Sequence, residues 1–229
     1  VSSAASDVYK RQVLILGASR GIGFEFARQY TAEGWRVLAT ARDDAGLARL
    51  KALGCEAISL DVAEPASVSR LSWALDGEEL DLAIHVAGVM SRAGADSPPT
   101  QPEFDRLMRT NVLGAMQVLP QVAPLLKPGK PMAFISSQMG SIADCQSSYG
   151  WIYRASKAAL NMAVHAAQPD YPHCVLLALS PGWVQTDMGG PGATLTVSDS
   201  VTRMRRALAA AGPEHRGAFI NQDGQPLPW

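Results

Sequence analysis

Cysteine is scarce in this 229-residue chain, and the three that occur stand at no ligand-like spacing: Cys55, Cys145 and Cys174. An odd, scattered number favours reduced thiols in a cytosolic protein over a disulfide framework. The four histidines are equally dispersed and form no metal-binding pattern. We therefore expect a cytoplasmic protein without a metal site.

The chain also lacks an excess of charge of either sign, because its formal net charge is −1 at pH 7. A near-neutral chain gives no electrostatic reason to bind nucleic acid or an anionic membrane. The longest apolar run, around Leu82 to Met90, is too short to cross a bilayer and contains His85. We expect neither nucleic acid nor membrane as a partner.

The first twelve residues, Val1 to Gln12, are polar and contain no apolar segment of the kind found in a signal peptide. We interpret residues 1–12 as a leader outside the fold. Hydrophobic residues make up 47% of the whole chain. Residues 13–229 contain no linker, repeat or low-complexity stretch. They are expected to form a single domain with one sizeable core.

Short apolar runs alternate with helical patterns along this domain. The expected strands are Val13–Leu16, Arg36–Thr40, Cys55–Leu60, Leu80–Val86, Pro131–Ser136, Cys174–Leu179 and Gly217–Asn221. The expected helices are Phe24–Glu33, one from Asp43 or Asp44 to about Gly54, Pro65–Gly77, Glu103–Leu126, Gly150–Gln168 and Ser198–Ala211. Pro120 and Pro124 are expected to kink or shorten the fourth of these helices. Apolar strands alternating with helices predict an α/β fold with one doubly wound parallel sheet of about seven strands, of the Rossmann type.

A phenol and an ammonium stand four residues apart in the run from Tyr153 to Lys157. On a helix this spacing places both on one face, about one turn apart. A free tyrosine has a pKa near ~10, and a fixed cation nearby lowers that pKa by favouring the phenolate. The pair predicts acid–base chemistry, although a surface lysine in an ordinary helix explains the same spacing when the pair stands alone.

A glycine-rich turn lies between the first strand and the first helix, with the sequence Gly17-Ala18-Ser19-Arg20-Gly21-Ile22-Gly23. Glycines allow a tight turn and close approach to a pyrophosphate, and the helix N-terminus offers free amides. The spacing is G-x-x-x-G-x-G rather than G-x-G-x-x-G. The position of the turn favours dinucleotide binding, while a turn that uses glycine for geometry alone is the alternative.

The end of the second strand reads Thr40-Ala41-Arg42, without the carboxylate that often binds the ribose 2′-hydroxyl of NAD. Arg42 and Arg20 supply two cations that suit a 2′-phosphate. We therefore predict NADP(H) as the cofactor and a large preference for NADPH over NADH. A solvated loop position for Arg42 is the competing interpretation.

Together with these features, several further motifs follow one another along the chain. They are Asp61-Val62, Thr110-Asn111-Val112, Ser136-Ser137, Tyr153-x-x-x-Lys157 and Pro181-Gly182. From about Val13 onward the chain resembles the short-chain dehydrogenase/reductase family. The stretch Ser136–Ile142 and the ending Asp223–Trp229 resemble the C-factor-like branch, which is related to small carbonyl reductases.

The resemblance implies a catalytic set of four residues. Tyr153 would protonate the carbonyl oxygen, and Ser137 would hydrogen-bond it. Lys157 would bind the nicotinamide ribose and lower the pKa of Tyr153, and Asn111 would hold a water in a proton relay to Lys157. The implied cofactor-binding positions are Gly17, Ser19, Arg20, Gly21, Ile22, Gly23, Arg42, Asp61, Val62, Ala87, Gly88, Tyr153, Lys157, Pro181, Gly182, Val184 and Thr186.

The chain departs from the family at two places that bear on the site. His85-Val86-Ala87-Gly88 replaces the usual Asn-Asn-Ala-Gly, so side-chain bonds that brace neighbouring strands are lost. Ser137 precedes Tyr153 by 16 residues, a few more than usual, which leaves Ser141 as a weaker candidate for the serine. His85 itself is expected to pack as a satisfied neutral histidine, and Trp35, Trp73 and Trp229 as packing residues.

The expected function is hydride transfer between NADPH and a ketone or aldehyde, or the reverse oxidation of an alcohol. The alternative is a C-factor-like signalling or regulatory protein that binds NAD(P) with little turnover. The expected partner is a small carbonyl or alcohol substrate. The resemblance leaves a homodimer, a homotetramer and a monomer open.

Overall fold

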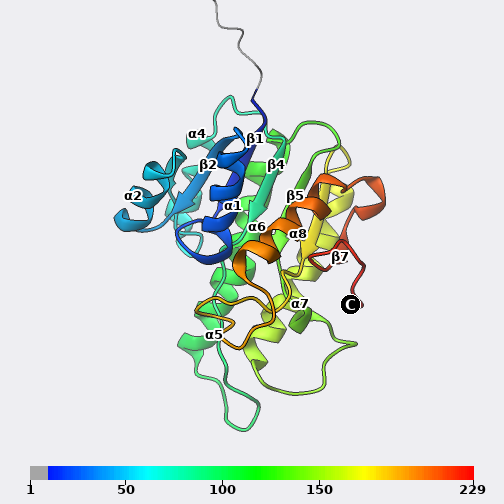
Figure 1. Cartoon of the computed structure of the whole chain (residues 1–229). Helices are drawn as coiled ribbons and strands as arrows, with labels where there is room; N and C mark the ends of the chain where they lie inside the picture. The colour runs from blue at the N-terminus through cyan, green and yellow to red at the C-terminus, as the bar shows by residue number, and fades with distance from the viewer. Residues whose placement is uncertain (1–9) are drawn as a thin grey trace, which may run out of the picture.

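Seven strands form one parallel sheet in the computed structural model, which describes residues 10–229 (Figure 1). The strands are β1 Gln12–Leu16, β2 Arg36–Ala41, β3 Glu56–Ser59, β4 Leu82–His85, β5 Pro131–Ile135, β6 Val175–Leu179 and β7 Ala218–Ile220. Their order across the sheet is β3-β2-β1-β4-β5-β6-β7, and every neighbouring pair is parallel. The doubly wound Rossmann-type sheet expected from the sequence is confirmed.

Helices cover both faces of the sheet. The α-helices are α1 Gly21–Ala32, α2 Asp44–Ala52, α3 Pro65–Val68, α4 Leu71–Ala74, α5 Gln101–Met108, α6 Gly114–Val122, α7 Trp151–Ala167 and α8 Val197–Ala209. Shorter helical turns are η1 Arg109–Leu113, η2 Ala123–Leu125, η3 Gln138–Gly140, η4 Gln168–Asp170 and η5 Pro213–His215. Figure 1 shows α1 and α8 side by side across one face of the sheet.

Alternate residues of each strand enter two separate cores. In β1, Val13 and Ile15 pack with side chains of α1, α2 and α8, whereas Leu14 and Leu16 pack with those of α3, α4, α6 and α7. These four residues of β1 are fully buried. Apolar residues on both faces therefore hold the sheet between two helical layers, as parallel sheets require.

The fold begins slightly earlier than expected. β1 starts at Gln12, the Arg11 carbonyl accepts a hydrogen bond from Arg36 N at 3.0 Å, and the Arg11 guanidinium lies 4.5 Å from the Trp35 ring centroid. The expected boundary of the leader after residue 12 is therefore wrong by two residues. The rest of the expected leader, residues 1–9, lies outside the described residues.

Two expected helices are divided. The segment expected as Pro65–Gly77 forms the short helices α3 and α4, with Pro65 in the first turn of α3. The segment expected as Glu103–Leu126 forms α5, a π-helical turn η1, α6 and a 3₁₀ turn η2. Pro120 lies inside α6, while the change in winding occurs at η1, around Asn111.

Among residues 10–229, no helix is both long and apolar enough to cross a bilayer. The same part of the chain contains no group of three or more His, Cys, Asp and Glu side chains arranged to hold a metal ion.

Candidate active site

The predicted site residues gather at the carboxyl edge of the sheet. Loops that follow β1, β2, β4, β5 and β6 meet there, and in Figure 1 they form the lower part of the molecule around the start of α7. This edge contains the point between β1 and β4 where the strand order reverses. Ligands of open parallel sheets bind at such a point.

Tyr153 and Lys157 occupy the buried face of α7, with exposed fractions of 6% and 3%. The helix follows Gly150, whose φ of +72° is in the left-handed region. A Cβ at Gly150 would also approach the Met139 side chain to 2.8 Å. Glycine therefore allows the chain to turn tightly under the loop before α7 and to bring Tyr153 inward.

Lys157 is held against the end of β5. Its Nζ donates to the Ile135 carbonyl at 2.8 Å and lies 5.6 Å from the Tyr153 ring centroid. Burial lowers the pKa of Lys157 to about 8. The ammonium remains the main form at pH 7, and its remaining donors are available to a bound ligand.

Burial raises the pKa of Tyr153 to about 12, and a side-chain hydrogen bond with Ser137 acts in the opposite direction. The phenol is nearly fully buried, and the Lys157 ammonium is directed to the Ile135 carbonyl. That Lys157 lowers the pKa of Tyr153 during the reaction stays a prediction. Tyr153 is a neutral phenol at pH 7, which is the form that can give a proton to a carbonyl oxygen.

Ser137, not Ser141, lies beside Tyr153. Ser137 begins the turn η3, and its Oγ accepts a hydrogen bond from Met139 N at 3.1 Å. Ser141 is buried and its Oγ is bonded to Asp144 N and the Trp229 carbonyl. The extra residues between Ser137 and Tyr153 form an exposed loop, residues 142–149, which includes the exposed thiol of Cys145.

Asn111 lies in the π-helical turn η1 and is buried. Its Oδ1 accepts from Val89 N at 2.8 Å, and its Nδ2 donates to the Val89 carbonyl and to Ser156 Oγ at 2.8 and 2.9 Å. Ser156 Oγ in turn donates to the Tyr153 carbonyl at 2.8 Å. The Asn111 side chain thus joins the segment after β4 to α7, a bracing role that the sequence did not reveal.

Gly88, which has no side chain, lies next to the side chains of both Asn111 and Lys157. A Cβ at Gly88 would lie 3.4 Å from Asn111 Oδ1 and 3.5 Å from Lys157 Nζ. Ala87 contacts the glycine turn, because a Cβ at Gly17 would approach Ala87 N to 2.7 Å. The segments after β1 and β4 are therefore packed against each other, with Asn111 and Lys157 next to Gly88.

The glycine turn has the features of a phosphate site. Gly17 N and Ala18 N are bonded to Thr40, so the first part of the turn is fixed to β2. Arg20 is the N-cap of α1 and makes no side-chain cap, which leaves the first amides of this 12-residue helix uncapped by a side chain. Uncapped amides at the positive end of a helix fit a dinucleotide phosphate. Gly21, Ile22 and Gly23 form the first turn of the same helix.

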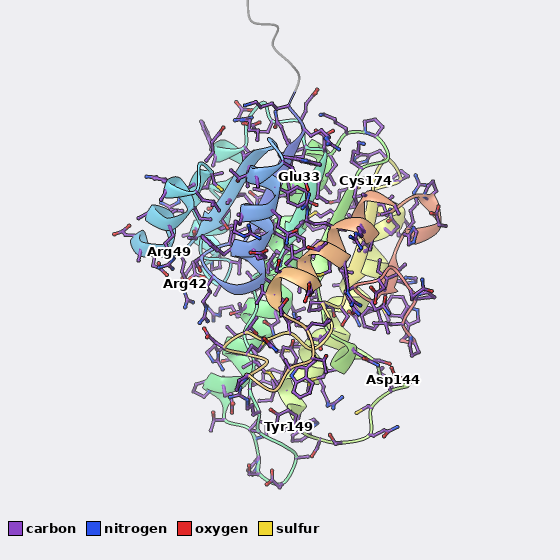
Figure 2. All side chains as sticks on the ribbon, in the orientation of Figure 1. Glu33, Arg42, Arg49, Asp144, Tyr149 and Cys174 are labelled. Atoms are coloured by element: carbon purple, nitrogen blue, oxygen red, sulfur yellow. The ribbon has the colours of Figure 1, made fainter. Side chains whose placement is uncertain are left out.

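Arg42 follows β2 and is exposed, and Figure 2 shows it at the same edge of the molecule as Arg49 of α2. The neighbouring carboxylate, Asp43, caps α2 by accepting a hydrogen bond from Gly46 N at 2.6 Å. The side chain of Arg20 forms an ion pair with Asp187, with 2.7 Å between Nη1 and Oδ2. Sequence reasoning identified Arg20 and Arg42 but missed Arg49 and Asp187, because neither belongs to a local motif.

The remaining predicted positions line the two sides of this edge. Val62 is buried against α6, where a Cβ at Gly114 would approach the Val62 carbonyl to 2.7 Å, and Asp61 precedes it at the surface of the same turn. On the other side, Pro181 and Val184 are buried, Gly182 has φ +77°, and Thr186 is half-buried. A Cβ at Gly21 would lie 3.7 Å from Thr186 Cγ2, so the two sides approach each other there.

His85 packs beneath the site with its ring centroid 5.7 Å from that of Phe134. Burial lowers the pKa of His85 to about 3, so the imidazole is neutral as expected. Its Nε2 has no hydrogen-bond partner among residues 10–229, so the expectation of a satisfied histidine is wrong for this part of the chain. The Asn111 side chain bonds to Val89, further along the segment that follows β4, and not to His85.

The sequence model of the short chain dehydrogenase family matches residues 11–193, which is most of the chain. The chain belongs to the short-chain dehydrogenase family. Across 66% of this chain and 93% of the relative, it is 40% identical to the protein named C-signal of Myxococcus xanthus. It is 32% identical, over 95% of this chain and 99% of the relative, to 1-hydroxy-2-glutathionyl-2-methyl-3-butene dehydrogenase of Rhodococcus sp. (strain AD45).

The fold is likewise shared with solved members of the family. A carbonyl reductase from Pseudomonas aeruginosa PAO1 in complex with NADP is similar with a TM-score of 0.86 and 32% identity, covering 96% of this chain and 100% of the other. In this short-chain dehydrogenase, Tyr153, Lys157, Ser137 and the glycine turn lie at the carboxyl edge of the sheet, so the motifs that carried the resemblance also meet in space.

Proposed function

We propose that this short-chain dehydrogenase is an NADP(H)-dependent oxidoreductase that reduces a ketone or aldehyde, or oxidises the corresponding alcohol. The observation that carries the proposal is the position of Tyr153, Ser137 and Lys157 at the same sheet edge as the uncapped glycine turn. The likeness to an NADP-bound carbonyl reductase supports it. When bound, the nicotinamide supplies or accepts the hydride.

The chain's own residues supply the acid, the donor and the positive charge. Tyr153, neutral at pH 7, gives its proton to the oxygen that becomes negative as the carbonyl is reduced. Ser137, which is hydrogen-bonded to Tyr153, donates to the same oxygen. Lys157 places its ammonium next to the phenol, where it binds the ribose hydroxyls and stabilises the phenolate left behind.

The cofactor-binding residues divide by the part of the dinucleotide they hold. When the dinucleotide is bound, the first amides of α1, from Gly21 to Gly23, would hold the pyrophosphate. The adenosine would be held by Asp61, Val62, Ala87 and Gly88. The nicotinamide would be held by Pro181, Gly182, Val184 and Thr186. Asn111 holds the segment that carries Val89 in place and retains a lone pair on Oδ1 for a water near Lys157.

Tyr153→Phe tests the proposal. General acid catalysis contributes a factor of about 10² to 10⁴ in rate. The variant should therefore consume NADPH at least about 100-fold more slowly with a panel of ketones and aldehydes. Binding of NADPH, measured by titration calorimetry, should remain within about threefold. Tyr149→Phe is the matched control, since Tyr149 is an exposed tyrosine four residues earlier (Figure 2) and should keep full activity.

The similarity to C-signal gives a specific reason to consider a second function, in which the protein binds NAD(P) and acts as a signal with little turnover. The burial of Tyr153 and Lys157 on one face of α7, with Ser137 beside the phenol, favours the enzyme. The two functions give opposite results in the same assay. NADPH binding without consumption of any carbonyl in the panel, unchanged by Tyr153→Phe, would support the signalling function and refute the reductase.

A further inference from the structure

A large aromatic side chain is presented by the loop that joins β6 to α8, at the carboxyl edge of the sheet (Figure 1). Trp183 of this loop is 57% exposed, although its Nε1 donates to the Gly189 carbonyl at 2.9 Å. The one polar atom of the indole is therefore bonded to the protein, and the exposed part of the ring is apolar. A single exposed ring is ordinary on a protein surface, but this ring is both fixed in place and close to Ser137.

The Trp183 ring is fixed by a compact turn in the same loop. Gly189 N donates to Thr186 Oγ1 at 3.1 Å, and Gly190 N donates to the Thr186 carbonyl at 2.8 Å. Gly189 also packs directly against the backbone, because a Cβ there would lie 2.0 Å from the Val184 carbonyl oxygen. The residue that accepts the indole hydrogen bond is thus itself held, which leaves the ring little freedom to turn.

Hydrogen bonds at the end of β6 place Trp183 close to the serine of the site. Gln138 N, directly after Ser137, donates to Ser180 Oγ at 3.1 Å. Ser180 stands three residues before Trp183, and three residues span at most about 11 Å between Cα atoms. A substrate whose oxygen is bonded to Ser137 therefore has the indole within reach of its other end.

The segment after β4 meets the same loop and brings apolar side chains to the phenol. Arg92 Nη2 donates to the Met188 carbonyl at 3.1 Å, which joins this segment to the loop between β6 and α8. Met90, two residues before Arg92, packs with Met139 against the small core that contains Tyr153. The neighbours of the reacting phenol thus include polarisable thioethers, which make favourable contacts with aromatic rings.

The charged side chains of these two segments are engaged elsewhere. Asp187 forms an ion pair with Arg20 at 2.7 Å, and Arg92 is bonded to the Met188 carbonyl. The groups left to contact the body of a substrate are apolar, and the largest of them is the Trp183 indole. Recognition at this place therefore depends on ring and thioether contacts and not on charge.

We propose that Trp183 is a specificity-determining residue, whose indole stacks on an aromatic ring of the substrate. The substrate class is then a ketone or aldehyde that carries an aryl group a few bonds from its carbonyl carbon. This role rests on the proposed reductase function and names the substrate class of the same site. Offset stacking favours an aromatic substrate over a saturated one of the same size, because both bury similar area and only the aromatic ring offers a π face.

Two ketones of matched size test the stacking. Phenylacetone carries an aromatic ring and cyclohexylacetone a saturated one, and in neither is the ring conjugated with the carbonyl. The wild type should reduce phenylacetone with a kcat/KM about five- to tenfold higher. Trp183→Leu should bring the two kcat/KM values to within about twofold of each other, while Trp183→Phe should retain most of the preference.

The ratio of the two kcat/KM values separates stacking from a merely structural role. Loosening of the loop in Trp183→Leu, which removes the bond to Gly189, slows both ketones alike and leaves their ratio unchanged. Trp73→Leu is the matched control, because Trp73 is 85% exposed on α4, at the opposite end of the molecule in Figure 1. This control should leave both kcat/KM values within about twofold of the wild type.

A substrate carboxylate bound by Arg92 is the competing mode of recognition, since a guanidinium has five N–H donors and one is bonded here. Phenylacetone with a para carboxylate should be reduced no faster than phenylacetone itself. A higher kcat/KM for the carboxylate, lost in Arg92→Gln, would overturn the proposed class.

The outcomes also distinguish the role of Trp183 from the proposed function. A ratio that is unchanged in Trp183→Leu would overturn the role of Trp183 and leave the reductase standing. Turnover of other carbonyl compounds but not of phenylacetone would do the same. If the wild type reduces no carbonyl compound with NADPH, both the reductase function and this role are refuted.

Discussion

The protonation states of Tyr153 and Lys157 set the chemistry at the scale of single residues. The pKa of the phenol, about 12, and that of the ammonium, about 8, both reflect burial, which disfavours the charged form of each group. At neutral pH the site therefore holds a proton on the acid and a positive charge beside it. This is the arrangement that reduction of a carbonyl needs.

These pKa values predict opposite pH dependences for the two directions of the proposed reaction. Reduction needs protonated Lys157, which is lost as the pH rises through about 8, so kcat/KM for a ketone should fall above that pH. Oxidation of the alcohol needs the phenolate, so its rate relative to reduction should increase with pH. The measurement is kcat/KM in each direction between pH 6 and 10.

Lys157→Arg provides the control for this profile, because the guanidinium remains charged over the whole range. The fall in reduction near pH 8 should disappear in any activity that this variant retains. A rate of reduction that stays constant from pH 6 to 10 in the wild type would contradict the assignment.

Some residue roles were predictable from the sequence and others were not. Tyr153 and Lys157 could be placed together because helical spacing alone sets their relation. The pairing of Arg20 with Asp187 joins residues 167 positions apart, and the contact of Arg49 with Ser19 depends on how α2 packs. Long-range contacts of this kind leave no local pattern.

The break between α5 and α6 is the most informative feature at the scale of elements. The sequence predicts one helix in this segment, kinked or shortened by Pro120 and Pro124, and α6 does end just before the 3₁₀ turn that contains Pro124. The π-helical winding occurs elsewhere, at Asn111, whose side chain bonds to Val89 and Ser156. The π-helical turn coincides with long-range hydrogen bonds of Asn111, and helix propensity cannot predict such bonds.

Asn111→Ala should lower the stability of the protein and its kcat. Truncation leaves the half-buried Val89 amide and carbonyl without their side-chain partner and removes one of the two bonds of Ser156 Oγ, which should lower the free energy of unfolding by about 2–4 kcal/mol. Urea denaturation measures this loss, and kcat should fall with it because Ser156 contacts the Tyr153 backbone.

The exposed residue Leu113 in the same turn serves as the comparison. Leu113→Ala should change the free energy of unfolding by less than about 1 kcal/mol, since the side chain is 43% exposed. Equal losses in the two variants would show that the bonds of Asn111 do not brace the turn.

At the scale of the whole molecule, the sheet order brings distant parts of the chain to one edge. Apolar strands and their alternation with helices allowed a doubly wound parallel sheet of about seven strands to be predicted, because right-handed crossovers leave few topologies. The ending of the chain was less predictable. The Trp229 carbonyl accepts hydrogen bonds from Ala143 N and Ser141 Oγ, so it meets the segment that follows Ser137.

Trp229→Ala keeps this backbone carbonyl and tests the packing of the Trp229 ring instead. The ring lies 5.1 Å from His165 and 5.8 Å from Phe219 between ring centroids, and its loss should lower the free energy of unfolding by about 1–2 kcal/mol. Thermal unfolding of the variant and the wild type in the same buffer measures this difference.

Trp73→Ala is the matched control, because Trp73 is 85% exposed, contrary to its expected packing role. It should leave stability within about 0.5 kcal/mol. A larger loss for Trp73→Ala than for Trp229→Ala would refute the packing argument.

The exposed loop between Ser137 and Tyr153 makes the protein convenient for spectroscopy. Cys145 of that loop is the exposed thiol, whereas Cys55 and Cys174 are buried. A maleimide dye would therefore attach at Cys145 without mutagenesis. Its emission would report events at the mouth of the site in real time, independently of nicotinamide absorbance.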